Sequence, residues 1–189
     1  MKNLFKKAVY VNLLLLTFCG CTHKVIDVNT DINTKYDVSY NEIKIKDYTI
    51  EKDVKVGDVV WVNGYVPIHK GFNPQLHEVL YKKLTNGLKN NKDGGKLEIS
   101  ILDSGLFMEK NFADDMAFIN IFRIAAEREF MCSAVISIED NSKFKRDTFE
   151  YKIKRGMFQS QEEISLFVSD CNDKLVEQVY KYIKTEFKN

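Results

Sequence analysis

Hydrophobic residues recur along this chain with two different spacings, and each change of spacing marks a new predicted element. Spacings of three and four residues predict an amphipathic helix, whereas strict alternation predicts a strand with one buried face. Helical spacing occurs after Asn73-Pro74, at Leu76, Val79, Leu80, Leu84 and Leu88, and again after Ser160, at Ile164, Val168, Cys171, Leu175, Val179 and Tyr182. Asn73 followed by Pro74 is typical of a helix start. Ser160 with Glu163 has the sequence of a capping box.

Alternating segments predict the strands. Residues 42–55 alternate with lysines on one side, which is typical of an edge strand or extended arm. Residues 59–66 are β-branched and aromatic, and residues 97–102 alternate. Two later segments alternate on either side of a predicted turn at 140–142. One face of the first segment contains Phe130, Cys132, Ala134, Ile136 and Ile138, and one face of the second contains Phe149, Tyr151 and Ile153. The pattern over 112–126 fits a helix, a strand or a loop equally well.

The order of these elements is strand, helix, strand, strand, strand, helix. This order favours an α+β fold with two layers, in which two helices pack on one face of a mostly antiparallel sheet. We expect a single domain over residues 42–189, because no internal repeat or low-complexity segment divides it.

The segment before this domain has a different character. Residues 22–40 are rich in Asn, Asp and Thr, and their few apolar residues follow no period. The pattern predicts a flexible tether over 21–41 with at most a short strand. A disordered segment of this length reaches about 25 Å.

The first twenty residues have the features of an export signal. Lys2, Lys6 and Lys7 precede an apolar stretch over residues 8–18. Its length suits the core of a signal peptide, while a bilayer-spanning helix requires about 20 residues. A buried N-terminal helix is the alternative, but a lysine-flanked apolar run at the extreme N-terminus is typical of export.

The segment 16–21, LTFCGC, resembles the lipobox of bacterial lipoproteins. In that family a small residue precedes a cysteine, which receives a diacylglyceryl thioether and becomes the first residue after cleavage. Gly20 makes Cys21 the preferred acceptor, although Phe18 occupies a position that is usually leucine. Cys19 has a leucine at the favoured upstream position, but the bulky Phe18 precedes it, so Cys19 remains the second candidate.

The resemblance implies a location in the cell as well as a lipid anchor. A lipoprotein cysteine carries two or three acyl chains, whereas one chain alone attaches a protein only reversibly. Thr22 follows Cys21, and in Gram-negative bacteria the absence of Asp at this position favours the outer membrane, with the domain facing the periplasm. The mature chain would comprise Cys21 to Asn189, 169 residues.

Composition narrows the function classes. The full chain has 28 basic and 27 acidic residues, and loss of the three leader lysines leaves 25 against 27. This near-neutral balance provides no global attraction for nucleic acid, so we expect no nucleic-acid partner. A hydrophobic content of 44% is too high for a disordered protein.

Two cysteines belong to the predicted domain, Cys132 on a strand and Cys171 on the last helix. Both lie on faces predicted to be buried, and an exported domain is in a compartment that permits disulfides. A bridge between them is favoured by the even count, with two buried free thiols as the alternative. A redox role is disfavoured, because no Cys-x-x-Cys motif occurs.

Candidate catalytic residues are sparse. His23, His69 and His77 are not accompanied by Cys or Asp at metal-ligand spacing, and Asp114-Asp115 is typical of a solvated pair. No nucleophile elbow, phosphate-binding glycine loop or His-Glu-x-x-His motif is present. We therefore expect no catalytic residue, metal or cofactor.

A basic cluster around the predicted hairpin at 143–155 is typical of a solvated strand face. Contact of this cluster with lipid phosphates or with an acidic protein is the alternative.

The predicted element order behind a lipidated cysteine resembles several small envelope lipoprotein families. These are the YajG-like lipoproteins, the auxiliary lipoproteins of ABC-type lipid transporters and the LPS-assembly lipoprotein LptE. The resemblance covers topology and lipobox, so Cys21 is the one residue whose role it implies.

We therefore expect a membrane-anchored, non-enzymatic envelope lipoprotein that binds a protein partner or supports an envelope or transport assembly. The candidate contact residues are Phe118, Ile119, Ile121 and Phe122, because so many apolar residues beside an aspartate pair are difficult to bury on one face. Ordinary core packing is the alternative for these four residues.

Two alternative functions remain. The first is binding of lipid or another small ligand, which a long apolar cavity would indicate. The second is a periplasmic hydrolase, which a histidine beside Asp or Ser in a cleft would indicate.

Overall fold

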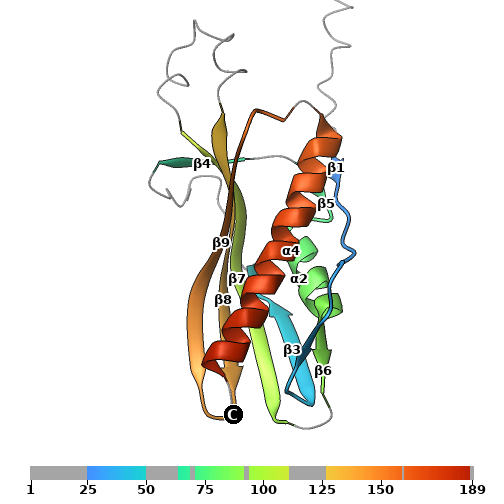
Figure 1. Cartoon of the computed structure of the whole chain (residues 1–189), viewed down its shortest axis with the longest axis vertical. Coiled ribbons are helices and arrows are strands. Elements are labelled where there is room, and N and C mark those ends of the chain that lie inside the picture. Colours follow the sequence, from blue (N-terminus) through green and yellow to red (C-terminus); the bar gives the residue numbers. More distant parts are fainter. Residues whose placement is uncertain are drawn as a thin grey trace, which may run out of the picture.

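Three long antiparallel strands form the centre of the molecule. The computed structural model describes residues 25–49, 64–68, 71–91, 94–110, 127–158 and 160–187. The strands are β7 (Lys96–Glu109), β8 (Arg128–Asp140) and β9 (Phe144–Arg155), and β8 pairs with both neighbours (Figure 1). One register shift between Ile101 and Asp103 interrupts the β7–β8 ladder. Such a bulge increases the local twist of the strand.

Two shorter strands pair with the other side of β7. The strand β3 (Glu42–Asp47) pairs with its first half in parallel, and β4 (Tyr65–Pro67) pairs with its last residues in the antiparallel sense. A helix lies between β3 and β7 in the chain and returns it to the starting end of the sheet. This crossover explains why β3 is parallel while the rest of the sheet is antiparallel.

Both described helices cover one face of this sheet (Figure 1). They are α2 (Leu76–Gly87) and α4 (Gln161–Glu186). The Ser160 hydroxyl accepts the N–H of Glu163, as the sequence predicted for this N-cap. The helix α2 begins two residues later than expected: Gln75 is its N-cap, and the Gln75 N–H donates to the Glu78 carboxylate.

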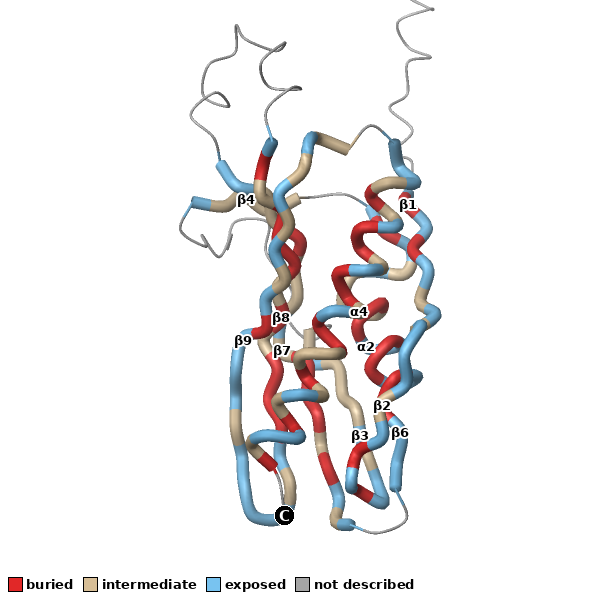
Figure 2. The backbone as a smooth tube through the Cα atoms, viewed as in Figure 1, coloured by how far each residue is buried: buried red, intermediate tan, exposed pale blue. Residues whose placement is uncertain are grey.

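The core lies between the sheet and the helices. The predicted strand face of β8 is buried over its whole length, and the predicted stripes of the two helices pack against it (Figure 2). The long elements follow the order β3, α2, β7, β8, β9, α4. The fold is therefore α+β, as the sequence predicted.

A segment that the sequence predicted to be a flexible tether forms part of the packed structure. Residues 25–40, which we call the strap, run along the outer side of the two helices (Figure 1). The strap contains β1 (Ile26–Asp27), which pairs with β5 (Phe72–Asn73), and β2 (Tyr36–Val38), which pairs with β6 (Leu88–Asn90). The tether prediction is wrong from Val25 onward, because Ile26, Val28, Val38 and Tyr40 are buried in the core.

The molecule is elongated, and α4 runs along it from one end to the other (Figure 1). With 26 residues, α4 is about 39 Å long. The upper end in Figure 1 contains β1 and the start of α4. The lower end contains the end of α4 and the turn between β8 and β9. We call these the β1 end and the Phe187 end.

Candidate functional site

The predicted lipid-attachment residue, Cys21, and the second candidate, Cys19, lie outside the described residues. Val25, the first residue that the structure describes, is four positions after Cys21. The proposed contact residues Phe118, Ile119, Ile121 and Phe122 also lie outside the described residues, as do His23, His69 and the Asp114-Asp115 pair. These predictions therefore remain open.

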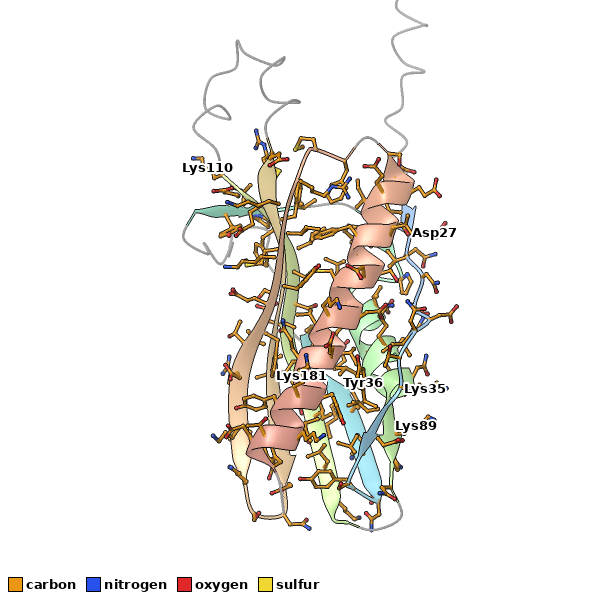
Figure 3. The ribbon with its side chains drawn as sticks, in the orientation of Figure 1. Asp27, Lys35, Tyr36, Lys89, Lys110 and Lys181 are labelled. Atoms are coloured by element: carbon orange, nitrogen blue, oxygen red, sulfur yellow. A yellow bond between two sulfur atoms is a disulfide. The ribbon has the colours of Figure 1, made fainter. Side chains whose placement is uncertain are left out.

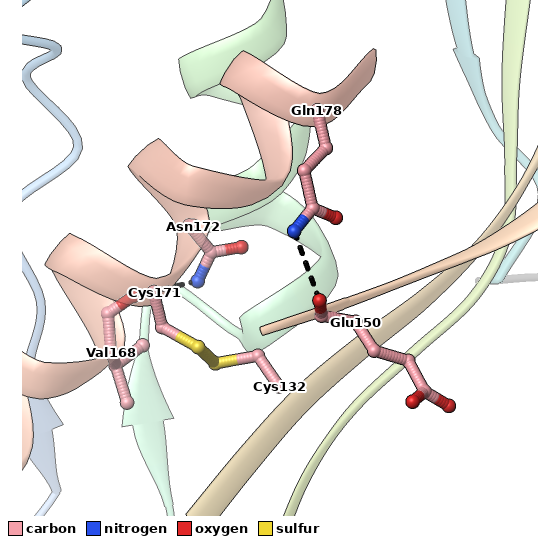
Figure 4. Close-up of a disulfide and its surroundings, with 6 residues drawn as sticks. All are labelled: Cys132, Glu150, Val168, Cys171, Asn172 and Gln178. Carbon is pink, nitrogen blue, oxygen red and sulfur yellow. Dashed lines mark hydrogen bonds between the residues drawn. A yellow bond between two sulfur atoms is a disulfide. The ribbon is translucent and has the colours of Figure 1, made fainter. Parts of the chain in front are cut away.

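A disulfide joins β8 to α4. The cysteines are Cys132 and Cys171, with Cα atoms 6.2 Å apart, and both are buried (Figure 4). The pairing that the even cysteine count favoured is thus present in the structure. Beside it lies a cavity of about 10 Å³, whose lining includes Ser104, Gly105 and Asn172. A space of this size holds one water molecule.

A lysine on α2 is buried in the interior of the described residues. The side chain of Lys83 has 0% exposure, yet it lies on the apolar stripe between Leu80 and Leu84. Its ammonium donates to the Asp31 carbonyl at 2.7 Å, the Ser169 hydroxyl at 3.1 Å and the Asp173 carboxylate at 2.6 Å. An ammonium has three donors, so all three are used. Lys83 therefore connects the strap, α2 and α4 at one point.

Several further contacts hold the strap along its length. Tyr36 stacks on Tyr180 of α4 with ring centroids 4.7 Å apart, and Figure 3 shows Tyr36 beside that helix. The Asn73 amide donates to the Asp27 carboxylate at 2.9 Å, next to the β1–β5 pair. Gly87 allows close approach at the end of α2, because a Cβ there would lie 2.5 Å from the side chain of Ile32. The strap thus contacts α4 through Tyr36, the end of α2 through Ile32 and β5 through Asp27.

A hydrogen-bonded group closes the Phe187 end. The Tyr40 hydroxyl has one proton, which the Phe187 carbonyl at 3.0 Å and the Asp140 carboxylate at 3.2 Å share as acceptors. Burial, followed by the charge of Asp140, raises the pKa of Tyr40 to about 12. Burial also raises the pKa of Asp140, but hydrogen bonds from Ser142, Lys143 and Tyr40 outweigh this effect and hold that pKa below its usual value. Tyr40 therefore remains a donor and Asp140 a carboxylate acceptor at neutral pH.

The basic cluster of the β8–β9 hairpin is largely paired within the domain. Lys145 lies 2.6 Å from the Glu186 carboxylate, Lys152 lies 3.3 Å from that of Glu150, and Arg155 lies 2.8 Å from that of Glu163. These pairs leave less net charge for an external anion than the sequence alone suggests. The hydrogen bonds of Lys145 raise its pKa and lower that of Glu186.

The edge of β9 is also partly covered by α4. The Gln178 amide donates to the Glu150 carbonyl at 3.0 Å, as Figure 4 shows. Covering an edge carbonyl in this way, together with basic side chains along the strand, reduces pairing with a further strand.

One histidine lies near an aspartate, which is part of the arrangement that a hydrolase would require. His77 Nε2 is 3.9 Å from Asp47 Oδ2, and both side chains are mostly buried. This separation exceeds hydrogen-bond distance. The Asp47 carboxylate instead accepts from the N–H of Thr49 at 2.9 Å and from its hydroxyl. The pair connects the start of α2 to the end of β3. Among the hydrogen bonds of the described residues, none joins a serine to His77.

Within the described ranges, no group of three or more His, Cys, Asp or Glu side chains is arranged to hold a metal ion. No helix in the described part of the chain is long and apolar enough to cross a bilayer.

Sequence reasoning missed the polar contacts of Lys83, Tyr40 and His77. The signal for Lys83 was visible in part, because it lies at a spacing that belongs to the buried stripe of α2. Its three partners lie 52, 86 and 90 positions away in the chain, so no local pattern predicts them.

Comparisons with known proteins leave the function open. No family model matches this chain. No curated protein matches it either. A solved structure described as the crystal structure of an uncharacterised protein is similar with a TM-score of 0.41 and 9% identity, covering 81% of this chain and 99% of that chain. A likeness of this degree supports no statement about function.

Proposed function

We propose that this protein is a lipoprotein of the bacterial cell envelope, anchored through lipids on Cys21, whose domain binds a protein partner and catalyses no reaction. In a Gram-negative source the domain would face the periplasm from the outer membrane. The observation that carries this proposal is the lysine-flanked apolar segment that ends in Gly20-Cys21.

The disulfide supports the export part of the proposal. Structural disulfides form and persist in oxidising compartments and are rare in the cytosol. The Cys132–Cys171 bond is buried between sheet and helix, where the core encloses it. A domain stabilised in this way is suited to the envelope.

The described interior supports a partner-binding role, because its polar groups are used to hold the domain together. The cavity beside the disulfide has room for one water molecule, whereas a lipid chain would require a long apolar cavity. The buried polar groups Lys83 and Tyr40 are used in holding the strap and the C-terminal end in place. Because these groups are already hydrogen-bonded within the domain, they stabilise the fold, and a partner would bind to the surface of the domain.

Cys21→Ser is expected to abolish lipid attachment, because a hydroxyl cannot form the thioether that holds the acyl chains. Cells fed an alkyne analogue of palmitate should label the wild-type protein and leave Cys21→Ser unlabelled, and Cys21→Ser should leave the membrane fraction. Cys19→Ser is the matched control and should label like the wild type. Labelling that survives in Cys21→Ser but is lost in Cys19→Ser would assign the anchor to Cys19. An unlabelled wild type would remove the anchor altogether.

Phe118→Ser with Phe122→Ser is expected to abolish partner capture while leaving the melting temperature unchanged, since we propose that these rings bind a partner. The tagged lipoprotein is purified from detergent-solubilised membranes, and the proteins captured by the wild type and by the double variant are compared. Phe144→Ser is the control, because Phe144 is 63% exposed at the Phe187 end. A large fall in melting temperature would show that Phe118 and Phe122 belong to the core.

A further inference from the structure

The proposed anchor is separated from the folded domain by very little chain. Four residue steps lead from Cys21 to Val25, the first described residue, and even a fully extended chain of that length spans at most about 14 Å. The strand β1 begins at the next residue, Ile26, which is buried. The domain therefore cannot move far from the lipid surface on such a tether.

The position of β1 decides which part of the domain lies near that surface. The Ser165 hydroxyl, in the second turn of α4, donates to the Asp27 carbonyl, so β1 lies beside the start of this helix (Figure 3). Arg155, the last residue of β9, pairs with Glu163 in the first turn of α4. Phe158 contacts Phe130 near the start of β8, with centroids 4.6 Å apart. The β1 end thus contains the start of α4, the start of β8 and the end of β9.

The opposite end is about one helix length away. The Tyr40 hydroxyl, the Phe187 carbonyl and the Asp140 carboxylate join the turn between β8 and β9 to the end of α4. The 26 residues of α4 separate this group from the β1 end by about 39 Å.

The strap connects the proposed anchor to the domain by contacts along its whole length. Its contacts begin at Ile26, whose N–H donates to the Gly71 carbonyl at 2.8 Å, and continue through the Lys83 ammonium to Tyr36. A flexible tether of twenty residues would let the domain rotate freely above the membrane. The packed strap removes most of that freedom, because the rigid structure begins within a few residues of the lipids.

We infer that the domain has one orientation on the bilayer, with the β1 end against the phospholipid head groups and the Phe187 end directed away from them. This inference rests on the proposed attachment of lipid at Cys21. Three large hydrophobic residues of the described chain are more than half exposed: Val25 at 54% and Leu166 at 63% lie at the β1 end, where head groups and upper acyl chains would contact them, and Phe144 at 63% lies at the Phe187 end.

Energy transfer to the membrane surface tests this orientation. The mature lipidated protein is reconstituted into vesicles of phosphatidylethanolamine and phosphatidylglycerol that contain a head-group acceptor dye. A donor dye is attached through a genetically encoded azide at Gln161, exposed at the β1 end, or at Asn141, exposed in the β8–β9 turn. Transfer should be high from position 161 and low from position 141, with a difference in height close to the length of α4.

A matched variant isolates the effect of the short tether. Ten Gly and Ser residues inserted between residues 23 and 24 should leave vesicle binding intact and reduce the difference between the two donor positions. Equal transfer from positions 161 and 141 without the insertion would overturn the orientation. Mass spectrometry of the same sample separates the two proposals, because an unmodified Cys21 would overturn the anchor and the orientation together, whereas a lipidated protein with equal transfer would overturn the orientation alone.

Discussion

Replacing Cys132 and Cys171 together by alanine is expected to lower the free energy of unfolding by about 4 kcal/mol, according to the chain-entropy account of cross-links. The two cysteines are 39 positions apart in sequence, and the loop that they close contains the whole of β9 and the start of α4. Without the bond, the unfolded chain gains the conformational freedom of that loop. Alanine is the suitable replacement because both sulfurs are buried, and serine would leave two hydroxyls in an apolar core.

Urea unfolding of the purified mature domain measures this effect. A reducing agent should lower the stability of the wild type towards that of the double variant and leave the double variant unchanged. Equal stabilities of the oxidised wild type and the double variant would show that the bond contributes nothing to the fold. A loss in the expected range would also support the export proposal, because the domain would depend on an oxidising compartment.

Lys83→Ala is expected to destabilise the domain by about 3 kcal/mol, at the lower end of the range for breaking a buried ion pair. The substitution removes the partner of the Asp173 carboxylate, the Asp31 carbonyl and the Ser169 hydroxyl at once. The Asp173 side chain is 20% exposed, so water can solvate it in part, and this limits the loss. Lys83→Met should cost less, because it keeps the length of the buried stem and avoids a cavity.

Hydrogen exchange locates this second effect. The N–H groups of Ile26 and Val28, which donate to the Gly71 and Asn73 carbonyls, should exchange faster in Lys83→Ala than in the wild type. The β7–β8 ladder should keep its relative protection. Lys82→Ala is the matched control, because Lys82 is the exposed neighbour on the same helix and its removal should leave stability nearly unchanged. Uniform loss of protection in every element would show that Lys83 stabilises the whole core and has no special relation to the strap.

The long elements could be predicted from sequence because each has a local signal. The alternation of β8 and the apolar stripe of α4 each continue for more than ten residues. Ser160 marks the start of α4, because its side chain accepts the N–H of Glu163. The cysteine pair followed from the same patterns, since both residues lie on faces that had to be buried. A periodic pattern reports which face is buried, and that information is independent of the rest of the fold.

The strap could not be predicted in this way. Its apolar residues follow no period, because Ile26, Val28, Val38 and Tyr40 join the core from an extended segment instead of forming one face of a regular element. The parallel pairings of β1 with β5 and β2 with β6 join segments about fifty positions apart. Short strands of two or three residues carry no alternation to detect. The same limit applies to Lys83, whose surroundings are assembled from three separate segments.

The sequence by itself determined the class of fold and the pairing of the two cysteines, and it predicts an export signal and a preferred lipidation residue, because each of these depends on local composition, spacing or periodicity. Only the tertiary structure decided that residues 25–40 pack on the helices, that Lys83 is buried with three acceptors, and that the chain enters the domain at the β1 end. These features depend on contacts between residues far apart in the chain, and such contacts exist only after the sheet and helices have come together.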